Sequence, residues 1–348
     1  MSHPPQLHVA TYHYVRDLPR TRFPQIKGML LDDFRSQAKA LPNFYEMATL
    51  ESAMEFLNGK YTPRRDLCLM TFDDGLREHY ADITPILAEE QIQGLFFLIS
   101  GCLEDGVVAP VHMNHFLMAH LGFAAYRSAF EKAVEDLGHA QELKTQADPA
   151  VFQRTYPLDT RDVARFKYLF NFVLPPQARD LAVKTLFGKY LGDEKAFGQE
   201  LYLNWSEARE MQRSGMIIGG HTHEHRPLAT LRYPEMSRDL TKNWELIQKN
   251  LEPQTIWPFS YPYGKADSFN RNAVEILRQL GYRFALCTEP GNNLPGADLF
   301  AVRRVDCKDI LANVTHPEVS CFSGIGKEPG PSRQTEVARL ANPQAPVA

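Results

Sequence analysis

The sequence predicts an α/β protein built on a parallel β-sheet, either open or closed into a barrel. Short, continuous apolar runs alternate with helical patterns along much of the 348-residue chain, as in parallel sheets that are covered on both faces. Polar residues follow several of these runs at the edge where open parallel sheets and barrels bind ligands. A chain of this length can bury a large core within a single domain.

The apolar runs define the expected strands. In chain order these are Leu7–Tyr12, Leu67–Phe72, Gly94–Ile99, Met216–Gly220, Thr255–Ser260, Arg283–Thr288 and Ala301–Val305. A helix is predicted after Pro234, because apolar residues recur every three or four positions until Pro253. Another helix is predicted from Ser206 as its N-cap to Gly215 as its C-cap.

The alternation is interrupted once. Between Leu103 and Gln199 only helical patterns occur, at Asn114–Leu137, Arg161–Val173 and Gln177–Leu191. We therefore expect a barrel-like domain over residues 1–324, interrupted by a helical insertion at 103–199 between the third and fourth strands. We expect the insertion to cover the site or to form a homo-oligomer contact, and to control which substrates enter. Residues 325–348 are polar and Pro-rich, and are predicted to be disordered.

Composition excludes several classes of protein. A formal net charge of -4 and a pI near 6.3 provide no basic field for nucleic acid. The longest apolar runs, such as Leu95–Ile99, are too short for a membrane span. The five cysteines form no Cys-x-x-Cys pair, and the chain does not start with a secretory pattern. We expect a cytoplasmic protein with free thiols.

The first chemical motif ends the second predicted strand, Leu67–Phe72, with Asp73, Asp74 and Gly75. Two carboxylates at the end of an apolar strand are costly unless a metal or a proton pairs them. The glycine permits a sharp turn, so that both side chains can face one cavity. The alternative is a solvated turn with a helix cap, which is how we interpret Asp32-Asp33.

The second motif, Gly219–His225, follows the fourth predicted strand. His221 and His225 are four residues apart, a spacing that suits one metal ion, whereas His223 is expected to point elsewhere. With Asp74 they form a two-histidine, one-carboxylate set that leaves positions open for water and substrate. A solvated histidine-rich turn is the alternative.

The third motif, Phe259–Gly264, places Tyr261, Pro262 and Tyr263 at another strand end. An aromatic, Pro-stiffened wall can stack against a sugar, or it can serve as ordinary packing. His13, which follows the first predicted strand, is expected at the same edge.

Together, Thr71–Gly75, His221-Thr222-x-x-His225 and Tyr261–Gly264 resemble the successive motifs of the polysaccharide deacetylase family, the NodB homology domain of carbohydrate esterase family 4. The similarity runs from Val9 to Val305, apart from the insertion. The resemblance implies an irregular (β/α) barrel of about seven parallel strands. It also implies hydrolysis of N-acetyl groups on amino sugars, with Asp73 as general base and with Asp74, His221 and His225 as metal ligands.

Two departures from the family pattern concern the remaining groups. Many members have an arginine in the third motif, where this chain has Ser260, and we expect Arg303 or Arg304 to replace it, with Arg304 in the substrate site. The late Leu-x-Leu-His motif that supplies a general acid is absent after Val305. The chain instead resembles a rearranged subgroup that opens with a Tyr-His strand, and His13 is our candidate acid.

The expected reaction is amide hydrolysis of an acylated amino sugar: a nucleotide sugar, a glycolipid precursor or an oligosaccharide. Zn²⁺ is the expected metal, and Co²⁺, Ni²⁺ and Fe²⁺ are alternatives. Three other activities stay open. A two-histidine, one-carboxylate set also suits a non-haem iron oxygenase; the same scaffold suits a deformylase or ring-opening amidase; and a relative without catalysis would be a sugar-binding module.

Overall fold

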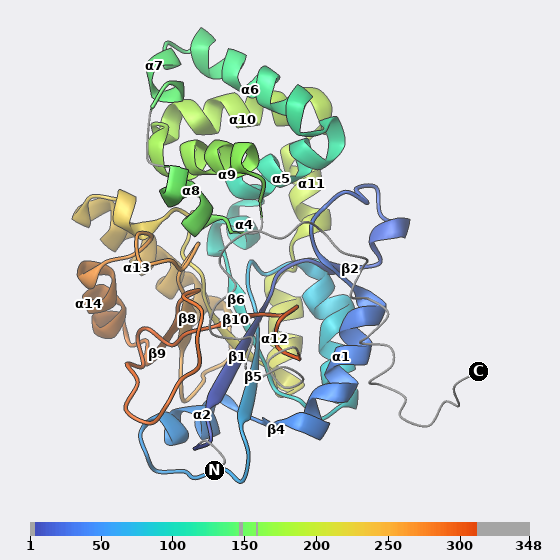
Figure 1. The fold of residues 1–348 in the computed structure, drawn as a ribbon, viewed down its shortest axis with the longest axis vertical. Coiled ribbons are helices and arrows are strands. Elements are labelled where there is room, and N and C mark those ends of the chain that lie inside the picture. Colours follow the sequence, from blue (N-terminus) through green and yellow to red (C-terminus); the bar gives the residue numbers. More distant parts are fainter. Residues whose placement is uncertain (1–3, 146–148, 158, 312–348) are drawn as a thin grey trace.

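The computed structural model describes residues 4–145, 149–157 and 159–311. Its centre is a sheet of parallel strands in the order β10-β1-β5-β6-β7-β8-β9, with β4 also paired to β5 (Figure 1). The strands are β1 Leu7–Tyr12, β4 Glu46–Met47, β5 Leu67–Phe72, β6 Gly94–Leu98, β7 Ile217–Gly220, β8 Pro258–Ser260, β9 Phe284–Leu286 and β10 Val305–Asp306. The predicted parallel α/β sheet is confirmed, and only the short β4 and the separate pair β2 (Val15–Arg16) and β3 (Met29–Leu30) were not expected.

The sheet curls into an irregular half-barrel. Side chains from strands far apart in the sheet, such as Leu7, Leu95 and Phe284, belong to one buried apolar cluster, so they must line a concave interior. After β9 the chain closes much of the remaining gap, because Val302 bridges to Leu286 while β10 pairs with β1. The irregular barrel that the resemblance implies is therefore the observed architecture.

Helices cover the convex face and the lower end of the barrel. They are α1 Leu31–Phe44, α2 Leu50–Leu57, α3 Thr84–Glu89, α12 Trp205–Arg213, α13 Tyr233–Asn250 and α14 Arg271–Leu280, with short 3₁₀ or π turns at Leu18–Arg20, His79–Ile83 and Leu228–Thr230. The expected N-cap of α12, Ser206, is wrong. Asn204 is the N-cap, because its side chain accepts the N–H groups of Ser206 and Glu207 while Glu207 bonds back to the Asn204 N–H, which completes a capping box.

Residues 100–201 between β6 and β7 are mostly helical and stack beyond the C-terminal end of β6 (Figure 1). The helices are α4 Ser100–Asp105, α5 Pro110–Leu121, α6 Phe123–Asp136, α7 Ala140–Leu143, α8 Pro149–Thr155, α9 Arg161–Tyr168, α10 Pro176–Tyr190 and α11 Glu194–Leu201, with a π turn at Leu169–Val173. The single helix expected over Asn114–Leu137 is wrong: Gly122, at φ 78°, separates α5 from α6. This segment has its own apolar core, which includes Phe116, Phe130 and Phe187.

Some expectations concern residues that the structure does not describe. The tail at 325–348 and Cys321 lie outside the described residues, whereas Cys68, Cys102, Cys287 and Cys307 are buried free thiols. Among the helices of residues 4–311 that are described, none is long and apolar enough to cross a bilayer.

Candidate metal and catalytic site

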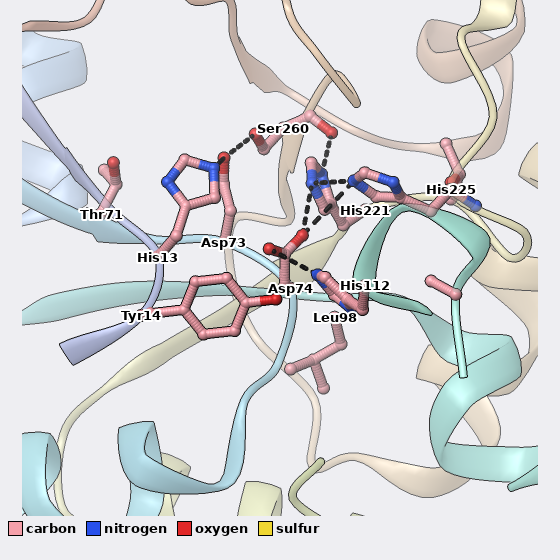
Figure 2. Close-up of polar contacts among 12 residues, drawn as sticks. His13, Tyr14, Thr71, Asp73, Asp74, Leu98, His112, His221, His225 and Ser260 are labelled. Atoms are coloured by element: carbon pink, nitrogen blue, oxygen red, sulfur yellow. Dashed lines mark hydrogen bonds and ion pairs between the residues drawn. The ribbon is translucent and has the colours of Figure 1, made fainter. Parts of the chain in front are cut away.

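Strand alternation brings the polar residues of four strands into the barrel. Interior positions follow a two-residue period, and in β1 and β5 they run through Leu7 and Leu67 in register with each other. The same period continues past the strand ends to His13 on β1 and Asp73 on β5. In β7 and β8 it reaches His221 and Ser260, and Figure 2 shows these four side chains around one space.

Asp74 joins them through a turn that breaks the alternation. Its φ is 81°, a left-handed conformation that residues other than glycine and asparagine rarely adopt, and Gly75 follows at φ 64°. Both carboxylates are nearly inaccessible, since Asp73 is 2% exposed and Asp74 4% exposed. The turn therefore places two consecutive carboxylates on the same side, as the Asp-Asp-Gly motif predicted.

Asp74, His221 and His225 converge on one point. The Nε2 atoms of the two histidines are 3.2 Å apart, and they lie 3.5 Å and 3.4 Å from Asp74 Oδ1. Figure 2 shows both imidazoles facing this carboxylate. Within the described residues, Asp74 Oδ1 is buried without a hydrogen-bond partner.

These donors fit a divalent cation. The Nδ1–H of His221 donates to the Ser260 carbonyl at 2.6 Å, which leaves the Nε2 lone pair directed at the cluster. Burial lowers the pKa of His225 to about 4, so this ring is neutral and able to ligate. Burial raises the pKa of Asp74, but His112, His221 and His225 outweigh it and hold the pKa well below its usual range. An ionised, buried oxygen facing two imidazole nitrogens is favourable when a cation lies among them.

Arg304 binds the carboxylate of Asp73. The guanidinium donates to both carboxylate oxygens, at 2.9 Å and 2.7 Å, and also to Ser260 Oγ at 3.0 Å. Burial raises the pKa of Asp73, but Arg304 and then His221 outweigh it and lower the pKa to about 2. Asp73 is therefore an ionised proton acceptor at neutral pH.

Arg304 thus occupies the space beside Ser260, the position at which many family members carry arginine. Its side chain is fully buried behind Asp73, so Arg304 contacts Asp73 and Ser260 instead of facing the open side of the site. It can act on substrate only through Asp73. The neighbouring Arg303 is exposed and does not share these contacts.

The loop with the two histidines is held from α13. Thr222 and His225 have positive φ values of 65° and 55°, which is a costly backbone conformation. The Asp239 carboxylate accepts the N–H groups of His223 and Glu224, both at 2.9 Å. The neighbouring Asn243 donates to the Thr222 carbonyl at 2.8 Å.

His223 points away from the cluster, as predicted from its spacing. Its Nδ1 lies 3.1 Å from Ser100 Oγ. Gly220 is required before this loop, because a Cβ there would lie 2.4 Å from Asn243 Oδ1.

His13 lies at the open side of the site. Its side chain is 48% exposed, and its Nε2 is 3.8 Å from Asp73 Oδ2. The buried His79 donates its Nε2–H to the His13 carbonyl at 2.9 Å and so fixes the end of β1. His13 is therefore a solvent-facing imidazole beside Asp73.

The aromatic motif divides between the core and the site. Tyr261 is fully buried, donates its hydroxyl to the Phe300 carbonyl and stacks on Phe269. It alternates with Ser260 and so points to the helical face, which makes its expected contact with substrate wrong. Pro262 is buried too. Of these three residues only Tyr263 is partly exposed, with its ring centroid 5.3 Å from that of His225.

A third histidine reaches the cluster from the helical insertion. His112 of α5 places its Nε2 3.0 Å from Asp74 Oδ2 and its Nδ1 2.5 Å from the Tyr202 hydroxyl. Sequence analysis did not identify this contact, because no spacing rule links His112 to Asp74. Because it is 1% exposed, it does not face solvent as a general acid would.

Comparisons with known proteins concern the family and the fold of this chain. The sequence model of the polysaccharide deacetylase family matches residues 60–144 and 183–285. A relative from Bacillus subtilis (strain 168) named as a polysaccharide deacetylase, YxkH, is 26% identical over 111 residues, which are 32% of this chain and 38% of the relative. The matched part thus spans well under two thirds of that relative.

Two solved structures share the fold. The Streptococcus pyogenes deacetylase PplD, in complex with acetate, aligns with a TM-score of 0.54 and 15% identity over 90% of this chain and 99% of that chain. IcaB from Ammonifex degensii aligns with a TM-score of 0.50 and 20% identity over 86% and 93% of the two chains. At such identities the likeness extends to the fold alone.

Proposed function

This chain belongs to the polysaccharide deacetylase family, and from that premise we propose that it is a metal-dependent hydrolase that removes an N-acetyl group from an amino sugar. The observation that carries the proposal is the buried cluster of Asp74, His221 and His225 beside the ionised Asp73. A ligand set and a proton acceptor at one barrel mouth are what amide hydrolysis requires.

We assign the metal to Asp74, His221 and His225. Two imidazoles and one carboxylate suit Zn²⁺, and they leave positions open for water and for the acyl oxygen. Bound there, a divalent cation would supply Lewis-acid chemistry by lowering the pKa of a water molecule and polarising the acyl carbonyl. Co²⁺, Ni²⁺ and Fe²⁺ are alternatives with the same ligands.

Asp73 acts as the general base. Its carboxylate accepts a proton from the attacking water while the water oxygen bonds to the amide carbon. Arg304 holds both carboxylate oxygens at hydrogen-bonding distance and so fixes the orientation of the base. Because the pKa of Asp73 is lowered to about 2, the carboxylate is unprotonated before each turnover.

His13 acts as the general acid. When the C–N bond breaks, its imidazolium gives a proton to the departing nitrogen, and the products are acetate and a free amine. Exposure of the ring and its position next to Asp73 support this role. Tyr263, the partly exposed aromatic residue beside His225, is the group that we assign to sugar stacking.

Mass spectrometry of acetamido sugars incubated with zinc-loaded protein tests the proposal. We expect loss of the acetyl mass with equimolar acetate, and product formation at least about a hundredfold slower with Asp73→Asn. Release of formate would identify a deformylase, and uptake of one water without acetate would identify a ring-opening amidase. Binding without any product would leave a sugar-binding module. The sugar itself and a cytoplasmic location stay predictions.

A further inference from the structure

We propose that the helical insertion contributes to the metal centre, because His112 on α5 orients the Asp74 carboxylate for the metal. His112 is itself held by Tyr202, the residue that directly follows the insertion. The inference rests on the metal site of the proposed function. His112 is a positioning residue in this account, since it acts through Asp74. It does not contact the reacting atoms.

The two oxygens of Asp74 have different surroundings. Oδ1 faces His221 and His225, whereas Oδ2 lies 3.0 Å from His112 Nε2. An ionised carboxylate can only accept hydrogen bonds, so His112 Nε2 must carry the proton of this bond. The bond fixes the side-chain torsion of Asp74 and keeps Oδ1 turned towards the two imidazoles. Hydrogen bonds to a ligating carboxylate tune metal affinity in this way.

His112 has little freedom to move. It lies in the first turn of α5, where Pro110 starts the helix and where the His112 N–H bonds to the Ala109 carbonyl at 2.9 Å. Its Nδ1 contacts the Tyr202 hydroxyl, which also accepts the Ala109 N–H at 3.1 Å. The ring is therefore held at both nitrogen atoms.

The two ends of the insertion meet behind Asp74. Tyr202 forms an isolated antiparallel bridge with Leu76, and the Leu203 N–H donates to the Gly75 carbonyl at 3.1 Å. These contacts join the exit of the insertion to the two residues that follow Asp74. The arrangement goes beyond the expectation that the insertion only controls substrate entry.

The test measures metal affinity in the full chain by competition with a chromophoric chelator, using Zn²⁺ and Co²⁺. His112→Phe should weaken binding by about 10–100-fold, the usual effect of losing a group that orients a ligand. Tyr202→Phe, which removes one hydroxyl, should weaken binding less. His112→Gln, which retains an N–H donor, should recover part of the loss.

His115→Phe is the matched control, because His115 is on the same helix and contacts the Tyr14 hydroxyl instead. It should bind metal as the unmodified protein does. The apo-protein melting temperature shows whether each variant folds. Should His112→Phe fail to fold, Tyr202→Phe decides the matter: unchanged metal affinity in that variant would overturn the proposal.

Two other results would contradict it. If folded His112→Phe binds metal as tightly as the unmodified protein does, His112 does not orient Asp74. A Co²⁺ absorption spectrum altered as in His221→Ala would make His112 a direct ligand. If the unmodified protein binds no metal, or if His221→Ala binds it normally, the proposed metal site itself is wrong, which is a different failure.

Discussion

At the residue scale, function depends on the groups that offset the energetic cost of burying two adjacent carboxylates. Asp73 and Asp74 are both almost inaccessible, yet both stay ionised, because Arg304 pairs with Asp73 and three imidazoles surround Asp74. Losing one partner of a buried charge pair usually costs more than the pair itself contributes. Single substitutions here should therefore change both stability and activity, and experiments must separate the two effects.

For Asp73→Asn we expect bound metal to be retained and turnover to fall by at least about a hundredfold, because the proton acceptor is lost. Unfolding free energy should fall as well, by about 3–5 kcal/mol if Arg304 loses all pairing. Adding Arg304→Met should restore part of the stability and none of the turnover. Arg303→Gln, at the exposed neighbouring residue, is the control and should change neither quantity. A metal-free Asp73→Asn would show that the roles of Asp73 and Asp74 are wrongly divided.

The role of His13 can be isolated with two substrates. His13→Ala should strongly slow hydrolysis of an acetamide, whose nitrogen needs a proton to leave, and should spare an activated aryl acetate, whose phenolate leaves unaided. His120→Ala, at an exposed histidine on α5, should change neither rate. Equal losses on both substrates, or no loss on either, would exclude the general-acid role.

At the element scale, the period of each strand decided which predictions succeeded. Asp73 and His221 continue the interior positions of β5 and β7, so apolar runs and strand ends were enough to predict them. The same rule separates Ser260 from Tyr261, and applying it would have assigned Tyr261 to the helical face. Helix ends were less predictable, because the Asn204 capping box and the break at Gly122 depend on local bonds that apolar periodicity does not reveal.

Asp239 is expected to stabilise the loop that carries His221 and His225. The Asp239 carboxylate accepts two backbone N–H groups of this loop, one at each oxygen. An asparagine side chain has only one acceptor oxygen, so its NH₂ group would face the second N–H, and two donors cannot bond to each other. Asp239→Asn should therefore loosen the loop and weaken metal binding by about tenfold. Glu245→Gln, at an exposed site on α13, should not. Calorimetric titration of both variants with metal gives the two affinities. Equal metal affinities in Asp239→Asn and Glu245→Gln would contradict the prediction.

At the scale of the whole molecule, contacts between distant segments complete the site. Arg304 comes from the residue directly before β10, and Asp239 comes from α13. His112 comes from the insertion, and Tyr202 directly follows it. The sequence predicted the motif residues because each follows its own strand. It did not predict the pairing of His112 with Asp74, 38 residues apart, because that contact depends on how the insertion folds back over the barrel.

Metal dependence can be measured by titrating metal-free protein with Zn²⁺ while acetate release from an acetamido sugar is followed. If Asp74, His221 and His225 hold one catalytic metal, the rate should rise in proportion to added zinc and reach its plateau at one equivalent per chain. His223→Ala should give the same curve, and His221→Ala should give no rise. Full activity in metal-free protein, or a plateau unaffected by His221→Ala, would contradict a catalytic metal held by Asp74, His221 and His225.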